Sequence, residues 1–362
     1  MSGRGSIAST SPRPHTSPLF LAAVLFIFFT VFYSGCGRRA EVITAQHSGR
    51  RVGPYDADGR YIAYVWSPAQ LMSTQGHLVL LDTFSSEEIE LEPDLNGPIT
   101  LSNGRVIWWN SRLRDVEGMS DVLVYDIEKR EKSAVARAKV AGLDADGAHI
   151  VWEQQHPDHG SEIVLFNQDT GQQKVINTPA ETLAINRNAQ IAGGMIAWET
   201  YIPKTNQSAI VLYNLADQKL SEIRSSHGHI RYSLSGEYLV YCQNKDIHLY
   251  AIASGDDRTI ASLERLKGTP RIEGNRIVWC EHIRKEEFKG IPGQPLMDEK
   301  DICNVLEYDI SSGKKRTIAA NLLSNAGVNI LGGRIYLPVY REYPPPGASN
   351  LVVSVDLMAW QT

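Results

Sequence analysis

The stretch GAHIVW at residues 147–152 joins a short polar turn to an apolar run that ends in a tryptophan. β-Branched and aromatic residues that follow a glycine-containing turn are typical of a β-strand. The same unit recurs along the chain at a spacing of about 45 residues, which indicates a repeat architecture. Its other copies are GRYIAY (59–64), NGRVIW (103–108), GGMIAW (193–198), GEYLVY (236–241), GNRIVW (274–279) and GGRIYL (332–337).

Three further units accompany most copies of this first one. A second strand unit, such as IVLYN (210–214), follows it and in most copies ends in Asp or Asn. A half-polar unit such as KRTIA (315–319) comes next, and a unit such as GPITLS (97–102) precedes the first. Four strands in each of seven repeats predict an all-β fold, a seven-bladed β-propeller with four-stranded blades.

The order of these units resembles the TolB-type, WD40-like propeller repeat. In that repeat a turn leads into an apolar strand with a terminal aromatic, and a second strand ending in Asp leads into a polar strand. The resemblance covers about residues 50–357. It implies a propeller fold and says little about function. The separate N-terminal domain of TolB has no counterpart here, so the resemblance is to the repeat and not to TolB itself.

The last repeat has no polar fourth strand before the chain ends at Thr362. The segment 40–46 (AEVITAQ) has no blade of its own and resembles such an outer strand, so it predicts a 3+1 closure of the ring. We call the face that carries the turns between first and second strands the short-turn face. We call the opposite face, with the longer connections between second and third strands, the long-loop face. Loops on one face of a rigid ring are the usual place for binding residues.

The N-terminus carries an export signal. Basic residues precede the uncharged run Leu19–Tyr33, which is about 22 Å long as a helix and so shorter than the membrane core. The next residues, Ser34-Gly35-Cys36, resemble the end of a bacterial lipoprotein signal and imply that Cys36 is lipidated. The predicted domains are a signal peptide (1–35), a lipidated tether (36–39) and the propeller (40–362). An uncleaved anchor and a cleaved, soluble export product are the alternatives.

Composition excludes several classes of protein. The net charge of −5 argues against a nucleic-acid partner, and four cysteines are too few for a disulfide scaffold. No hydrolase, nucleotide-binding or metalloprotease motif occurs, and no metal or cofactor is expected. Cys280 and Cys303 flank the longest loop at the ends of two neighbouring strands, where they form either a disulfide or two buried thiols.

The aromatic residues that end the repeat units either pack between blades or form a stacking platform for sugars, and their recurrence in nearly every blade favours packing. The residues that follow them vary more. The long loops of the last two repeats also contain apolar and aromatic side chains. These side chains either contact a binding partner or pack against each other as a cap over the channel mouth. The candidate binding face therefore comprises Glu153, Glu199, Tyr201, Glu281, His282, Phe288, Tyr340 and Tyr343.

These features predict an exported, lipid-anchored module of the bacterial cell envelope, facing the periplasm or the cell exterior. It contacts the membrane through its lipid and binds an envelope protein through the long-loop face. The alternative is a propeller that binds or cleaves carbohydrate, with carboxylates such as Glu153, Glu199 and Glu281 at the channel mouth and a small molecule or glycan as ligand. A structural part of a larger assembly is the third possibility.

Overall fold

The computed structural model describes residues 40–42, 50–68, 76–110, 118–156, 160–177, 184–262, 266–282, 302–323, 327–342 and 354–361. All regular elements among them are β-strands, paired antiparallel into four-stranded sheets. The predictions for Cys36, Phe288 and Tyr343 lie outside the described residues.

Six of the sheets are blades built from four strands that are consecutive in the chain. The first three blades are β2–β5 (Arg50–Asp58, Tyr61–Pro68, Gly76–Asp82, Glu88–Leu95), β6–β9 (Ile99–Ser102, Arg105–Trp109, Ser120–Asp126, Glu131–Ala138) and β10–β13 (Val140–Asp146, His149–His156, Gly160–Asn167, Gln172–Val175). The next three are β14–β17 (Ile185–Ala192, Met195–Ile202, Gln207–Asn214, Leu220–His227), β18–β21 (Arg231–Ser235, Tyr238–Gln243, Asp246–Ala251, Asp257–Ser262) and β22–β25 (Leu266–Glu273, Arg276–His282, Ile302–Asp309, Lys314–Leu323).

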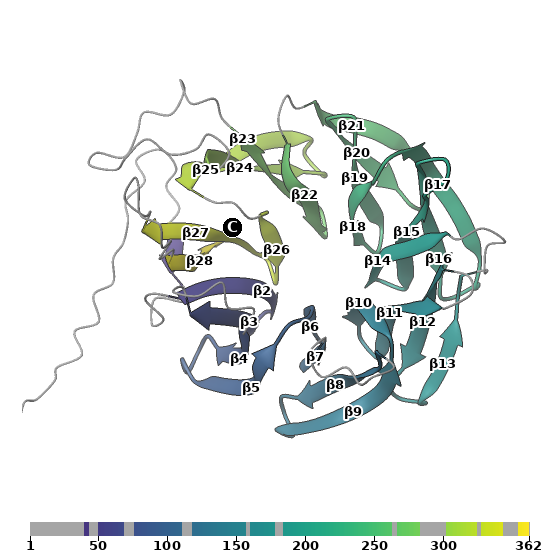
Figure 1. The fold of residues 1–362 in the computed structure, drawn as a ribbon. Helices are drawn as coiled ribbons and strands as arrows, with labels where there is room; N and C mark the ends of the chain where they lie inside the picture. Colours follow the sequence, from purple (N-terminus) through teal and green to yellow (C-terminus); the bar gives the residue numbers. More distant parts are fainter. Residues whose placement is uncertain are drawn as a thin grey trace, which may run out of the picture.

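The remaining sheet is composite and joins the two ends of the chain, in the order β1-β28-β27-β26. Its strands are β1 (Ala40–Val42), β26 (Asn329–Leu331), β27 (Arg334–Glu342) and β28 (Ser354–Gln361). In Figure 1 the sheets surround a central axis, with the first strand of each blade innermost. The fold is therefore a β-propeller.

The prediction of seven blades is wrong, because the fold has six blades of consecutive strands and one composite sheet. The predicted outer strand from the N-terminus does pair with β28 of the composite sheet, and it is described over Ala40–Val42 of the predicted 40–46. Six blades are continuous in sequence, and the composite sheet differs from them. Its edge strand β1 is described over three residues, and β28 extends to Gln361. The reason for the difference is that this sheet takes its edge strand from the other end of the chain, so its four strands do not follow one another in sequence as those of the six blades do.

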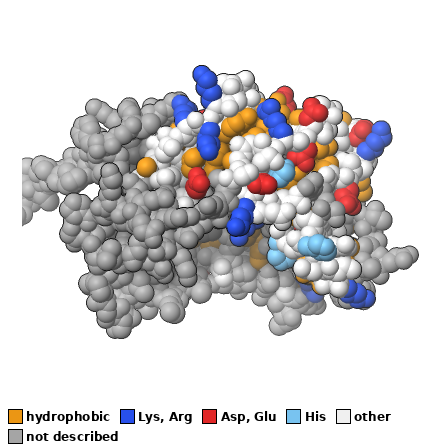
Figure 2. Space-filling view, turned by 90° about the horizontal axis from the view of Figure 1, so that it is seen from above, with side chains coloured by type: hydrophobic (Ala, Val, Ile, Leu, Met, Phe, Trp, Pro, Cys, Tyr) orange, Lys and Arg blue, Asp and Glu red, His pale blue; other side chains and the backbone are white. Residues whose placement is uncertain are grey.

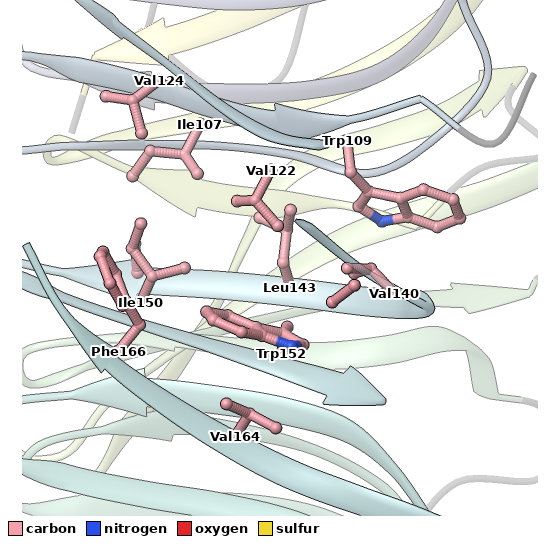
Figure 3. Close-up of a cluster of buried hydrophobic side chains, with 12 residues drawn as sticks. Ile107, Trp109, Val122, Val124, Val140, Leu143, Ile150, Trp152, Val164 and Phe166 are labelled. Atoms are coloured by element: carbon pink, nitrogen blue, oxygen red, sulfur yellow. The ribbon is translucent and has the colours of Figure 1, made fainter. Parts of the chain in front are cut away.

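The aromatic residues that end the repeat units are packed between blades, as predicted. Trp108, Trp152 and Trp279 are wholly buried, and the equivalent side chains of the other sheets are at most 2% exposed. Figure 3 shows one such interface, where Trp109 and Val122 of one blade face Leu143 and Trp152 of the next. Because every face between blades is filled in this way, these residues stabilise the ring and are not accessible to a sugar.

Polar side chains join the inner strands around the channel. The inner edge of each first strand carries backbone N–H groups that no further strand can pair. Side chains of the preceding blade accept hydrogen bonds from several of them. The pairs are Asp56 with the amide of Leu101 (2.7 Å), Asp144 with Ile191 (2.9 Å), Gln190 with Leu234 (2.9 Å) and Ser233 with Ile272 (3.4 Å).

Candidate functional site

Glu153 and Glu199 lie within strands and not in the long loops that follow those strands. The strands β11 and β15 continue past the aromatic residue as far as His156 and Ile202. Glu153 is 8% exposed and Glu199 is wholly buried. Neither is a solvated rim charge, because each accepts a hydrogen bond from a backbone amide of the next blade.

Glu199 is the centre of a network at the junction of blades β14–β17 and β18–β21. Its Oε1 accepts hydrogen bonds from the Ser208 hydroxyl (2.7 Å) and from the amide of Ile230 (3.0 Å). Its Oε2 accepts a hydrogen bond from Nε of Arg187 (2.8 Å), its partner across strands β14 and β15. Buried carboxylates are stabilised by pairing and hydrogen bonding, and these contacts hold the Glu199 side chain in position.

Arg187, Tyr201 and His229 form the outward side of this network, and we call these three residues the mouth site. Nη2 of Arg187 lies 3.1 Å from Nε2 of His229, whose Nδ1 lies 3.5 Å from Glu199. The Tyr201 ring lies 4.7 Å from the His229 ring and 5.1 Å from the Arg187 guanidinium carbon. The site is on the long-loop face, because β15 ends and the connection to β18 arrives there. It presents cationic and aromatic groups, whereas the acid lies beneath them.

Glu153 occupies the same position in the preceding blade but has a different environment. Its Oε1 accepts a hydrogen bond from the amide of Ala189 (3.0 Å). A Cβ atom on Gly142 would lie 2.8 Å from this oxygen, so the carboxylate fills the space that a side chain there would need. Burial raises the pKa of Glu153 above its ordinary value, and amide hydrogen bonds and Arg187 oppose this only in part.

The structure does not bring the remaining predicted residues to the mouth site. Glu281 and His282 are half-buried at the end of β23, two blades along the chain from β14–β17. Tyr340 lies in β27 of the composite sheet. These three residues stay predictions for binding, with no described contact to Arg187, Tyr201 or His229.

Cys280 and Cys303 are not directly opposite each other. Cys280 pairs with Val305, and Cys303 pairs with His282, so the two cysteines are diagonal neighbours. Both are wholly buried in the same hydrophobic cluster with Val278 and Leu322. A disulfide between them stays a prediction, which thiol counting on denatured, unreduced protein tests.

Two carboxylates meet at the channel wall. The Thr100 hydroxyl lies 3.1 Å from Oδ2 of Asp56 and 3.3 Å from Oδ1 of Asp144. Burial raises the pKa of Asp56 to about 6 and, with a contribution from the neighbouring Asp56 charge, that of Asp144 to about 7. Arg271 of the sixth blade opposes the shift of Asp56, which places its charge near the same part of the wall. Asp144 is therefore partly protonated at neutral pH.

A cavity lies on the opposite, short-turn face. It has a volume of about 1180 Å³ and crosses the turns of blades β10–β13, β14–β17 and β18–β21. Lys174 lines it and is held by the Tyr213 hydroxyl (2.7 Å) and Gln218 (2.9 Å). Seen edge-on in Figure 2, cationic and acidic side chains alternate over the described surface, with hydrophobic side chains between them. The described part of this edge therefore shows no patch of a single charge.

Sequence reasoning missed Arg187 and the role of His229. The signal was a polar run, INRNAQIA, that interrupts the apolar alternation of an inner strand, where β14 bulges between Arg187 and Gln190. Bulges re-aim side chains next to functional sites. Among the described residues, no three His, Cys, Asp or Glu side chains are placed to hold a metal ion. No helix in the described ranges is long and apolar enough to cross a membrane, and the run at 19–33 lies outside them.

Similar solved structures are propellers or contain one. An oligogalacturonate lyase in complex with manganese aligns with a TM-score of 0.60 at 10% identity, over 91% of this chain and 94% of the lyase. An acylaminoacyl peptidase from Pyrococcus horikoshii aligns with a TM-score of 0.59 at 12% identity, over 86% of this chain and 51% of the peptidase. TolB from Acinetobacter baumannii aligns at 11% identity with a TM-score of only 0.44, over 86% of this chain and 79% of TolB.

No protein-family model and no curated protein sequence matches the chain. Identities this low establish the fold alone. The chain is a β-propeller module, and this fold hosts many unrelated functions, so its activity has to be argued from its own residues.

Proposed function

We propose that this chain is an exported, lipid-anchored propeller that binds a protein partner at the bacterial cell envelope through its long-loop face. The observation that carries the proposal is the mouth site, where a wholly buried Glu199 holds Arg187 and His229 beside the Tyr201 ring. Tyrosine and arginine held in fixed positions are typical of the residues that dominate the binding energy of protein interfaces.

The position of β1 supports a particular orientation of the ring relative to the membrane. Ala40 pairs with Trp360 near the end of β28, so β1 begins on the short-turn face. Cys36 precedes β1 by only a few residues in the sequence. A lipid on Cys36 would hold the short-turn face toward the membrane and direct the mouth site away from it.

The carbohydrate-cleaving alternative gains no support from Glu153 or Glu199. Acid–base catalysis needs carboxylates that reach the substrate. Both oxygens of Glu199 are used by Arg187, Ser208 and Ile230, and the side chain is wholly buried. Glu153 is bound to the inner strand of the next blade.

Site-specific photo-crosslinking in native envelopes tests the proposal. A benzophenone amino acid replaces the exposed Asn206, in the connection beside Tyr201, in the full-length protein. The matched control carries it at the exposed Glu237, in a short turn of the adjacent blade. We expect a discrete protein adduct from position 206 and none from position 237, with the Cys36→Ala variant lost from the membrane fraction.

Three results would contradict the proposal. Adducts from position 237 alone would reverse the orientation. A Cys36→Ala variant that stays in the membrane fraction would remove the lipid anchor. Loss of the position 206 adduct together with saturable binding to a glycan would favour the carbohydrate alternative.

A further inference from the structure

We propose that the mouth site recognises a carboxylate on an acidic segment of the protein partner, with Arg187 as the principal donor. This inference rests on the proposed function and adds the chemical class of the ligand.

Arg187 keeps unused hydrogen-bond donors on its solvent side. A guanidinium group carries five N–H groups in a planar fork. Its Nε points to Glu199 and its Nη2 to His229. Among the described residues none accepts a hydrogen bond from Nη1, and the side chain is 27% exposed. The group is thus anchored on one side and able to donate to a ligand on the other.

The charge balance at this mouth favours an anion. Glu199 neutralises one cation, but it is buried with both oxygens occupied and offers no acceptor to solvent. Arg231 adds a second, exposed guanidinium on the adjacent inner strand, held by a hydrogen bond to the carbonyl of Gly268 (3.3 Å). Arginine pairs with carboxylates through two parallel hydrogen bonds, which gives both strength and orientation.

Tyr201 and His229 add a wall beside these donors. The tilted rings of Tyr201 and His229 are in contact, and the Tyr201 hydroxyl lies 3.3 Å from Oδ1 of Asn206. The aliphatic part of a glutamate or aspartate side chain can pack on such a wall while its carboxylate meets Arg187. Because Arg187 and Tyr201 lie on paired strands, Ile185 opposite Tyr201 and Arg187 opposite Glu199, binding requires little ordering of the site.

Fluorescence anisotropy with a fluorescein-labelled hexaglutamate peptide tests the inference on the full-length protein in detergent. Hexaglutamine is the neutral control peptide. We expect saturable binding of hexaglutamate and about tenfold weaker binding for Arg187→Gln. Arg187→Lys should bind about threefold to tenfold more weakly than wild type, because it keeps the charge but not the fork. Lys219→Gln, which removes an exposed cation on the short-turn face, should change binding less than twofold.

Arg187→Gln leaves a buried carboxylate without its cation and can unfold the protein for that reason alone. A second variant is therefore needed to separate a loss of binding from a loss of folding. Arg231→Gln removes an exposed charge and should weaken hexaglutamate binding about threefold while leaving the unfolding midpoint unchanged. Equal binding of hexaglutamate and hexaglutamine, or equal binding by wild type and both arginine variants, would overturn the inference. Tighter binding of alginate than of hexaglutamate would also overturn it, in favour of an acidic sugar.

Different results would refute the proposed function and the proposed ligand class. A position 206 adduct without hexaglutamate binding leaves the envelope module in place and refutes only the ligand class. Hexaglutamate binding without any position 206 adduct refutes the partner at the long-loop face.

Discussion

Glu153 and Glu199 occupy the same position in neighbouring blades, one residue after a buried tryptophan, yet they differ in what surrounds them. Both accept a hydrogen bond from an amide of the next blade. Glu153 faces the bare backbone of Gly142, whereas Glu199 faces Arg187 and, beyond it, His229. The shared contact joins the blades, and in the second blade a partly exposed cation lies against the same joint.

The same distinction separates the other carboxylates of the ring. Asp56 and Asp144 resemble Glu153, since they accept amide and hydroxyl hydrogen bonds and have no ion pair among the described residues. Burial raises the pKa of each of these three groups. Burial thus disfavours the charged form of the carboxylates that serve only to join two blades, and Glu199 differs from them in its contact with an arginine.

The largest loss of stability is expected when Glu199 is replaced. Glu199→Ala should lower the free energy of unfolding by about 3–5 kcal/mol, because it leaves the Arg187 charge and the Ile230 amide without their buried partner. Glu153→Ala should lower it by about 1–2 kcal/mol, because only an amide loses its acceptor. Urea denaturation at pH 7 measures both. Equal losses for the two variants would contradict the comparison.

The second effect is a dependence of stability on pH. The folded pKa values of about 7 for Asp144 and about 6 for Asp56 exceed their ordinary value of 3.8. The folded protein therefore binds more protons than the unfolded chain between about pH 4 and 7, and its stability falls as the pH rises through this window. We expect a loss of about 4 kcal/mol between pH 5 and pH 8, most of it from Asp144, so that Asp144→Asn should reduce it by more than half. A stability that rises over this range in wild type would contradict the assignment.

A smaller effect is expected at the glycine that faces Glu153. Gly142→Ala should lower the free energy of unfolding by about 1–2 kcal/mol, because its Cβ would lie 2.8 Å from the carboxylate oxygen. The same substitution in a Glu153→Ala background should have a much smaller effect, since the obstacle is gone. Additive losses in this double-mutant cycle would show that the two residues do not interact.

The smallest effect is expected from Glu153→Gln. Glutamine keeps an oxygen for the amide of Ala189 and removes a charge that burial disfavours. The free energy of unfolding should stay within about 1 kcal/mol of wild type at pH 7 and should increase slightly at pH 8. A loss above 2 kcal/mol would indicate that the ionised form is needed, as at Glu199.

The repeat could be recognised from sequence because each blade repeats its own local pattern. GAHIVW at 147–152 gives the turn, the strand and the buried Trp152 in one stretch, and the structure confirms this unit. Contacts between blades follow no such pattern. Arg187 meets Glu199 because of a bulge in β14, and His229 arrives from the next blade. The strand extensions to His156 and Ile202 were hidden because polar residues at strand ends resemble loops.

The composite sheet affects how the ring would respond to a mechanical force on its N-terminal strand. Only the pairs Ala40–Trp360, Glu41–Ala359 and Val42–Met358 connect β1 to the rest of the fold within the described residues. Tension applied through a tether before Ala40, with a partner held at the opposite face, runs along these strands and loads the three pairs together in shear. Under such a load β1 would be expected to detach first, because three residue pairs are all that the structure describes between β1 and β28.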